Sequence, residues 1–366
     1  MKAKKIIISG GGTGGHVFPA IAIANALKEI DSSIEILFVG ANGKMEMEKV
    51  PEAGYKIKGL PVRGFLRKFS LKNFVVIFNL LRSLFLSYKI IKTFKPDIVV
   101  GVGGFASGPV VYMASLSGIP ALLQEQNSYA GITNKLLAKR AEKICVAYDN
   151  MDRFFPGQKI VKSGNPVRQA LYKNSIDKEL ALNYFGLDKY KKIILILGGS
   201  GGAKSINEAV INKLERIKVS DVQVIWQTGK FYFEISNKAA IEKNLKNCLV
   251  KDFIIRMDYA YRAADMVISR AGAATISELC LLEMPAILVP SPNVAEDHQT
   301  KNAMALVEKN AALLIRNKEA YEHMIDEALN LINNAEKLNE LSENCSKLGI
   351  ENSDKIIAKE ILNIID

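Results

Sequence analysis

Two glycine-rich stretches are the residues in this chain best suited to hold a phosphate. Residues 10–15 (GGGTGG) and residues 198–202 (GGSGG) each follow an apolar run. A glycine turn between a strand and a helix exposes backbone N–H groups at the positive end of the helix dipole, where phosphate binds. The first stretch also satisfies the G-x-G-x-x-G pattern of dinucleotide-binding proteins, so this pattern alone leaves the ligand open.

Neither stretch completes the motif of a common cofactor enzyme. A nicotinamide-binding unit needs an acidic residue at the end of its second strand, and residues 37–45 (LFVGANGKM) supply none. The second stretch resembles a P-loop, but Ala203 stands where that motif needs glycine, and residues 222–226 offer no Asp for magnesium. A dehydrogenase therefore loses its main support, and we reject a P-loop kinase or ATPase.

Polar residues near the ends of two predicted strands are candidates for acid–base chemistry. His16 directly follows the first glycine stretch, where it could act as a general base or could cap the helix and donate to a phosphate. Glu125 and Asn127 end another apolar run. Three roles stay open for Glu125: a base, a group that orients His16, and a plain hydrogen-bond acceptor.

A second group of polar residues lies in the C-terminal half. Residues 269–278 predict a strand end, a turn and a helix start, in which Glu278 could accept from the two hydroxyls of a ribose. Residues 295–303 place Gln299 at a loop-to-helix junction of the kind that often reads a sugar, the alternative being an ordinary exposed helix start. The chain has no D-x-D, so a metal-bridged diphosphate is not expected, and Arg168 with a helix N-terminus would stabilise a leaving diphosphate.

The apolar runs predict two similar doubly wound α/β domains. Strands alternate with helical stretches, which is typical of a parallel sheet covered on both faces. A lysine pair, an apolar run and a glycine stretch occur in the same order twice, with Lys4 matching Lys191 and Gly15 matching Gly202. We predict an N-terminal domain over 1–163, a C-terminal domain over 164–346, and a closing helix over 347–366 that packs back on the first domain. The predicted strands cover 4–9, 34–40, 96–104, 118–127, 141–147, 191–197, 222–229, 248–254, 264–272 and 285–292.

The composition indicates an ordered protein without a structural metal. The chain has 366 residues, of which 49% are hydrophobic and 24% are charged. Its four cysteines lie far apart with no C-x-x-C pair, which favours reduced thiols in the cytosol over a zinc site or a disulfide scaffold. The apolar run near the N-terminus is too short for a signal peptide.

One segment carries nearly all of the net charge of +11. Residues 53–96 contain no Asp or Glu, and residues 74–94 within them are the most apolar stretch of the chain. Polar and basic residues interrupt this stretch, so it does not predict a transmembrane helix. An ordinary core helix with a solvated basic face is one interpretation, and nucleic-acid binding is the weakest. A surface that meets anionic lipid headgroups fits best. The basic residues are Lys56, Lys58, Arg63, Arg67, Lys68, Lys72, Arg82, Lys89, Lys92 and Lys95.

The order and spacing of seven motifs resemble the MurG family of peptidoglycan glycosyltransferases. The motifs are GGGTGGHVFPA, GVGGFASGP, QEQN, GNPVR, GGSGGA, RAGAATISE and EDHQTKNA. The resemblance implies the GT-B fold, in which two Rossmann-like domains face a central cleft. It also implies metal-independent, inverting transfer of N-acetylglucosamine (GlcNAc) from UDP-GlcNAc to the C4 hydroxyl of the muramyl sugar of undecaprenyl-diphosphate-MurNAc-pentapeptide (lipid I), which gives lipid II. No cofactor is expected.

The resemblance further implies roles for individual residues. His16 and Glu125 match residues proposed for catalysis. The remaining positions would bind substrates: Thr13, Gly14 and Gly15 at the cleft, Asn127 and Gln299 on GlcNAc, Arg168 and Ser200 on the diphosphate, the backbone of Ile254 on uracil, and Ala273, Ala274, Thr275, Ile276, Ser277 and Glu278 on phosphate and ribose. Gln124 and Phe105 depart from the His and Tyr usual in the family, and Gly201 from a larger residue.

The implied location is peripheral, on the cytoplasmic face of the cell membrane. The partners would be UDP-GlcNAc, lipid I and an anionic membrane surface that meets residues 56–95, with no nucleic acid. Other cell-wall synthesis proteins stay open as partners. Two alternatives remain: a GT-B glycosyltransferase with another lipid acceptor, and a non-catalytic sugar-nucleotide-binding protein.

Overall fold

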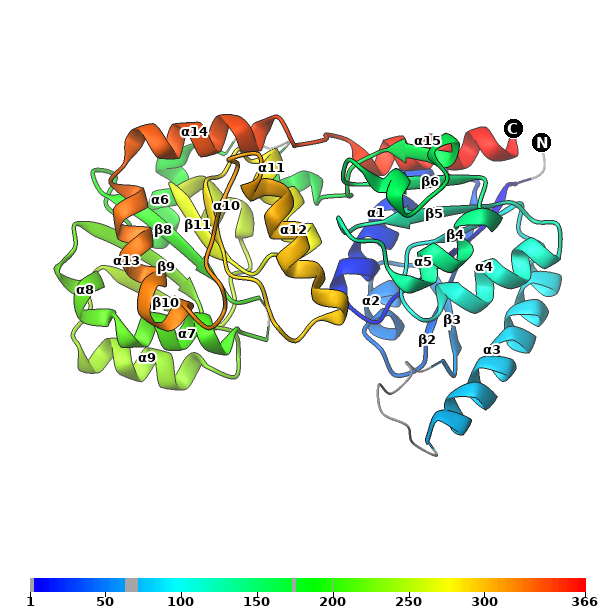
Figure 1. The fold of residues 1–366 in the computed structure, drawn as a ribbon, viewed down its shortest axis with the longest axis horizontal. Helices are drawn as coiled ribbons and strands as arrows, with labels where there is room; N and C mark the ends of the chain where they lie inside the picture. The colour runs from blue at the N-terminus through cyan, green and yellow to red at the C-terminus, as the bar shows by residue number, and fades with distance from the viewer. Residues whose placement is uncertain (1–2, 63–71, 173–175, 200) are drawn as a thin grey trace. The chain divides into compact units, whose positions relative to one another are not determined.

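The computed structural model describes residues 3–62, 72–172, 176–199 and 201–366 (Figure 1). The chain forms two compact units: unit 1 comprises Met1–Val167 and Glu351–Asp366, and unit 2 comprises Arg168–Ile350. The first boundary lies beyond the predicted 163/164 because the next residues are hydrogen-bonded within unit 1. The Gly164 N–H donates to the Val146 carbonyl (3.1 Å), and Asn165 Nδ2 donates to the Gln126 carbonyl (3.0 Å).

Unit 1 is built on a seven-stranded sheet in the order β3-β2-β1-β4-β5-β6-β7, with every pair parallel. The chain leaves β1 toward β2 on one side and later returns to β4 on the other. Ligands of open α/β sheets bind outside the carboxyl ends of the strands at such a reversal. The strands are β1 (Lys5–Ser9), β2 (Glu35–Ala41), β3 (Lys56–Leu60), β4 (Ile98–Gly101), β5 (Ala121–Glu125), β6 (Lys143–Val146) and β7 (Ile160–Lys162).

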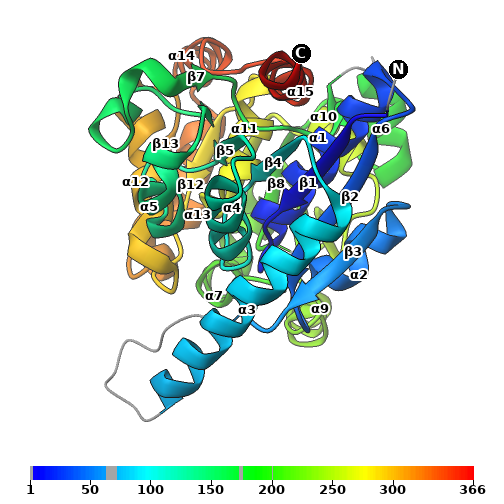
Figure 2. The ribbon, with the colours of Figure 1, turned by 90° about the vertical axis from the view of Figure 1, so that its right-hand side faces the viewer.

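Helices cover both faces of this sheet (Figure 2). On one face, α3 and α4 pack with the sheet in one apolar core, to which Ile91 and Val111 belong. On the other face, α1 packs with α15, the last helix of the chain, in a core that includes Ile23 and Ile357. The C-terminal helix therefore belongs to unit 1. The helices are α1 (Gly14–Ile30), α2 (Glu46–Glu52), α3 (Lys72–Phe94), α4 (Ser107–Leu116), α5 (Ile132–Leu137) and α15 (Ser353–Ile365).

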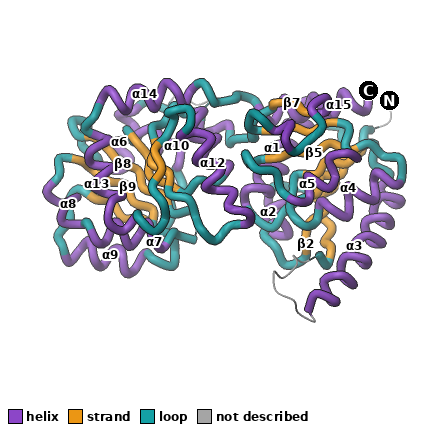
Figure 3. The backbone as a smooth tube through the Cα atoms, in the orientation of Figure 1, coloured by secondary structure: helices purple, strands orange, loops and turns teal. Residues whose placement is uncertain are grey.

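Unit 2 repeats the plan with a six-stranded parallel sheet in the order β10-β9-β8-β11-β12-β13. Its reversal lies between β8 and β11, and Figure 3 shows the alternation of strand and helix. The strands are β8 (Lys192–Leu197), β9 (Val222–Gln227), β10 (Cys248–Lys251), β11 (Met266–Ser269), β12 (Ala286–Leu288) and β13 (Leu313–Leu314). The helices are α6 (Lys178–Phe185), α7 (Lys204–Asn212), α8 (Leu214–Val219), α9 (Phe233–Glu242), α10 (Met257–Ala263), α11 (Ala273–Leu281), α12 (His298–Val307), α13 (Ala320–Ile332) and α14 (Ala335–Ser346).

The predicted fold class, two doubly wound parallel-sheet domains, is confirmed. Each predicted strand is present, because long buried apolar runs identify strands of a parallel sheet. Three strands were not predicted. β3 alternates lysine with apolar residues at the sheet edge, and β7 and β13 are too short to stand out as apolar runs.

The packing of α15 against α1 gives a test of the fold. Ile357 is fully buried in unit 1, so Ile357→Ala should lower the free energy of unfolding by about 2–5 kcal/mol. Lys359→Ala, on the exposed side of the same helix, should leave it nearly unchanged. Urea unfolding measures both, and equal stability of the two variants would contradict this role of α15.

Candidate functional site

The first glycine stretch connects β1 to α1 at the sheet reversal of unit 1. The Gly11 N–H donates to the Gly103 carbonyl (3.3 Å), which joins this turn to the segment after β4. His16 lies in the first turn of α1, where its Nδ1 and Thr13 Oγ1 form a hydrogen bond (3.1 Å). A side chain at position 103 would place its Cβ 2.9 Å from His16 Nε2, so glycine there leaves room for the imidazole.

A buried carboxylate from α2 clamps the same turn. Glu46 Oε2 accepts from the Gly12 N–H (2.8 Å), and Oε1 accepts from the Ala41 N–H at the end of β2 (2.9 Å). Glu46 is 1% exposed, and a Cβ at Gly11 would lie 2.2 Å from its carboxyl carbon. The Gly12 amide, which a bound phosphate could otherwise use, is therefore already paired with an anion. Glu46 was not identified from the sequence, since nothing in the spacing of residues 44–48 marks it.

Replacing Glu46 tests the clamp. Glu46→Gln keeps the size but turns an N–H donor toward one of the two backbone N–H groups, which leaves a buried donor unpaired. We expect the free energy of unfolding to fall by about 1–3 kcal/mol. Glu48→Gln, an exposed neighbour on the same helix, is the matched control. Thermal or urea unfolding measures the difference, and a Glu46→Gln protein as stable as the control would show that the clamp contributes nothing.

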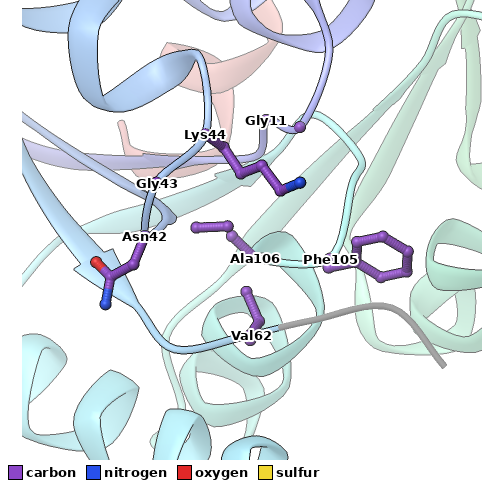
Figure 4. Close-up of a pocket in the computed structure, with 9 residues that line it drawn as sticks. Gly11, Asn42, Gly43, Lys44, Val62, Phe105 and Ala106 are labelled. Atoms are coloured by element: carbon purple, nitrogen blue, oxygen red, sulfur yellow. The ribbon is translucent and has the colours of Figure 1, made fainter. Parts of the chain in front are cut away.

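A pocket of about 470 Å³ opens beside this turn in unit 1 (Figure 4). Gly11 and Gly12 form one wall, and Phe105 and Val62 line it with apolar surface. Lys44 also lines the pocket and brings a positive charge to it. Phe105, which stands where the resembled family usually has tyrosine, is 58% exposed and therefore lies at the surface. The pocket offers a cation and apolar walls to a ligand.

Glu125 is buried at the end of β5, and its oxygens are engaged by protein donors. Oε1 accepts from the Asn127 N–H (3.1 Å) and Asn127 Nδ2 (3.3 Å); Oε2 accepts from the Gly131 N–H (2.9 Å) and Asn134 Nδ2 (2.9 Å). Burial raises the pKa of Glu125, and these four hydrogen bonds act in the opposite direction. Of the three roles left open, this geometry favours the hydrogen-bond acceptor, which holds the loop bearing Asn127. The catalytic role of Glu125 stays a prediction.

Gln124, which stands where the resembled family has histidine, is fully buried. Its Nε2 donates to Asn165 Oδ1 (3.0 Å), and its Oε1 accepts from Gln126. These bonds tie the end of β5 to the segment 164–167 that ends unit 1. The side-chain amide at position 124 is therefore buried and bonded to other side chains of unit 1.

In unit 2 the candidate residues gather around the start of α11. The predicted residues Ala273 to Glu278 lie in α11, and Gly272 precedes it at the carboxyl end of β11. Just before the helix, Arg270 donates to Asn317 Oδ1 (2.7 Å) and Ser205 Oγ (3.1 Å). The guanidinium thus ties this loop to α7, which follows the second glycine stretch. The second stretch lies between β8 and α7, and its Ser200 lies outside the described residues.

Glu278, the residue predicted to bind the ribose, is bonded to Arg168, the residue predicted to bind the diphosphate. Its Oε1 accepts from Arg168 Nη2 (3.2 Å), and its Oε2 accepts from the hydroxyl of Tyr261 in α10 (3.0 Å). Burial raises the pKa of Glu278, and the charge of Arg168 and these two hydrogen bonds act in the opposite direction. Tyr261 was not identified from the sequence, because one tyrosine in a helix carries no motif.

Two other predicted contacts already have partners in the protein. The Ile254 N–H donates to Gln227 Oε1 (2.9 Å), so a uracil held by this N–H would have to displace Gln227. Gln299 Oε1 accepts from the Ser291 N–H (2.8 Å), which fixes its side chain over the loop after β12. The structure therefore brings Arg168 and Glu278 together in unit 2, and Thr13 and His16 together in unit 1. Among the described residues, no group of His, Cys, Asp or Glu is arranged to hold a metal ion.

Two doubly wound units, each with a glycine turn at its sheet reversal, define the GT-B fold of two-domain glycosyltransferases. The chain belongs to glycosyltransferase family 28: the N-terminal domain of that family matches residues 6–146, and its C-terminal domain matches residues 193–361. The expected resemblance is thereby confirmed at the level of the family.

Two similar proteins align with nearly the whole chain. It is 58% identical over 363 residues to the UDP-N-acetylglucosamine–N-acetylmuramyl-(pentapeptide) pyrophosphoryl-undecaprenol N-acetylglucosamine transferase of Phocaeicola vulgatus, covering 99% of this chain and 96% of that one. A protein of the same name from Parabacteroides distasonis is 57% identical over 366 residues, covering 100% of both.

Solved structures are similar as well. The crystal structure of Acinetobacter baumannii MurG has a TM-score of 0.80 at 28% identity and covers 98% of this chain and 99% of that one. A UDP-GlcNAc 2-epimerase from Neisseria meningitidis bound to UDP-GlcNAc has a TM-score of 0.68 at 16% identity, covering 98% of this chain and 100% of that one. This second likeness concerns the fold alone, so the fold does not choose between transfer and epimerisation.

Proposed function

We propose that this chain transfers GlcNAc from UDP-GlcNAc to the C4 hydroxyl of the muramyl sugar in lipid I, which gives lipid II. The observation that carries the proposal is the 58% identity across 99% of the chain with a transferase named for this reaction. The candidate site supports it independently, since unit 2 combines a buried carboxylate, a cation and a helix N-terminus suited to a nucleoside diphosphate.

The donor site would be in unit 2. Glu278 would accept from the ribose hydroxyls, and Arg168 would meet the diphosphate. Arg168 uses one of its five N–H donors on Glu278, so further donors on the same guanidinium suit a phosphate. Gln299 would form hydrogen bonds with hydroxyls of GlcNAc, and the backbone of Ile254 would lie beside the uracil.

The reaction needs one proton acceptor and one stabilised leaving group. His16 takes the proton from the C4 hydroxyl, and that oxygen forms a bond to C1 of GlcNAc from the face opposite UDP. The bond from C1 to the phosphate oxygen breaks, UDP leaves, and the α linkage becomes β. The helix dipoles and Arg168 stabilise the charge on the departing diphosphate.

A transfer assay decides between this function and its alternatives. Labelled UDP-GlcNAc and a short-chain lipid I analogue are incubated with the full chain in the presence of EDTA. A β-1,4-linked product is expected, which would support the acceptor and the metal-independent mechanism together. Tight UDP-GlcNAc binding without transfer would point to another lipid acceptor or to a non-catalytic sugar-nucleotide-binding protein.

The base assignment makes a separate prediction. His16→Ala should lower turnover by about 100-fold or more, because general-base catalysis contributes roughly that amount. UDP binding, measured by calorimetry, should change little, since the proposed donor site lies in unit 2. His323→Ala, an exposed histidine of α13, is the control. Turnover of His16→Ala close to that of the control would exclude His16 as the base.

The membrane contact is proposed to be made by α3. This helix exposes Phe78, Leu81 and Phe85 along one stripe, and its exposed basic residues Arg82 and Lys89 interleave with them. Apolar side chains that enter a lipid interface beside lysine and arginine fit an anionic bilayer surface. Among the described residues, no helix is both long and apolar enough to cross a bilayer. Arg63, Arg67 and Lys68 lie outside the described residues. We propose a peripheral location on the cytoplasmic face of the cell membrane.

Vesicle binding tests the α3 surface. Replacing Phe78 and Phe85 together with serine should weaken binding to vesicles containing phosphatidylglycerol by about 10-fold or more, because each phenyl ring contributes roughly 1.5–3 kcal/mol when buried. Phe231→Ser, which alters an even more exposed phenylalanine of unit 2, is the control. Co-sedimentation measures the partition, and binding equal to that of the control would contradict the assignment.

A further inference from the structure

The carboxylate of Glu278 accepts a hydrogen bond from Tyr261, a residue that no motif identifies. Tyr261 is 2% exposed, and its hydroxyl donates to Glu278 Oε2 at 3.0 Å. The other oxygen, Oε1, accepts from Arg168, whose side chain is 58% exposed. One anchor is therefore rigid and buried in the core of unit 2, while the other extends into solvent.

The hydrogen-bonding capacity of the carboxylate matches a ribose once both anchors are counted. An ionised carboxylate has about four lone-pair sites, two on each oxygen. Tyr261 and Arg168 each use one of them, on different oxygens. One site stays on each oxygen, and a ribose 2′,3′-diol presents two adjacent O–H donors.

We propose that Tyr261 is a positioning residue that fixes the Glu278 carboxylate in the rotation needed to accept from both ribose hydroxyls of the nucleotide. The inference rests on the proposed function, since it takes Glu278 as the ribose ligand. It goes further by assigning a residue that never touches the nucleotide and by giving Tyr261 a part in selecting a ribonucleotide.

The electrostatics of the pair keep the roles of donor and acceptor fixed. Burial, and then the nearby Glu278 charge, raise the pKa of Tyr261 well above its usual range, so its hydroxyl stays a donor at neutral pH. Arg168 does not duplicate this anchor, because it donates to the other oxygen, Oε1, from a side chain that is more than half exposed. Without Tyr261, the terminal torsion of Glu278 is broad and restrained on one side only.

The test compares two nucleotides on two proteins. Calorimetry with UDP and with 2′,3′-dideoxy-UDP gives, for each protein, the factor in affinity that the hydroxyls contribute. Tyr261→Phe removes only the hydroxyl and keeps the ring. We expect UDP affinity to fall by about 3- to 10-fold, while dideoxy-UDP affinity stays within about 2-fold of the unmutated protein. In the transfer assay KM for UDP-GlcNAc should rise with kcat little changed.

Each outcome decides one point. Equal losses for both nucleotides would mean that Tyr261 only supports the fold, and no loss for either would also overturn the proposal. An unmutated protein that binds both nucleotides equally would instead remove Glu278 as the ribose ligand, a failure of the proposed donor site. Tyr190→Phe, which alters an exposed tyrosine of the same unit, is the control and should change neither affinity. Because each factor compares two ligands on one protein, partial destabilisation does not obscure the result.

Discussion

The close approach of two backbone segments at the reversal of the first sheet is the constraint on which unit 1 depends. Gly104, after β4, lies so near the turn after β1 that a Cβ there would stand 2.3 Å from the Gly11 carbonyl oxygen. β1 and β4 end at the same sheet edge because they are parallel. The segments that follow these two strands are therefore in close contact. Gly104 avoids this clash because it has no side chain, and in the same way Gly103 leaves room for the His16 ring and Gly11 for the Glu46 carboxylate.

The two glycine turns look alike in sequence and differ in what surrounds them. In unit 1 an internal carboxylate takes the Gly12 amide, which leaves the ligand a pocket with Lys44 and apolar walls. In unit 2 the anionic group near the site is Glu278, and it is paired with Arg168 rather than with a glycine amide. Two copies of one α/β plan thus provide different electrostatic environments, which fits an enzyme that must hold two chemically different substrates.

The sequence predicted the sheets well and the site in part. Apolar runs ending in glycine or polar residues mark parallel strands, and every run predicted as a strand contains one. His16, Arg168 and Glu278 were recognisable because they adjoin those strand ends or belong to a motif. Glu46 and Tyr261 were not, since each acts through a helix whose own sequence is ordinary and reaches the site only by tertiary packing. The hydrogen-bond partners of Glu125 could not be identified from the sequence, because they lie on the loop after β5 and in the short helix α5, which no periodicity marks.

The placement of α15 has a consequence for how the chain folds as it is synthesised. Ile357 and Ile361 complete the core over α1, yet they follow the whole of unit 2 in the chain and leave the ribosome after it. Unit 2, formed by Arg168–Ile350, is contiguous and is complete earlier. Unit 1 begins before unit 2 and is completed after it, so the apolar face of α1 lacks its cover until α15 has been synthesised. A nascent or truncated chain without α15 therefore exposes apolar surface to chaperones and proteases.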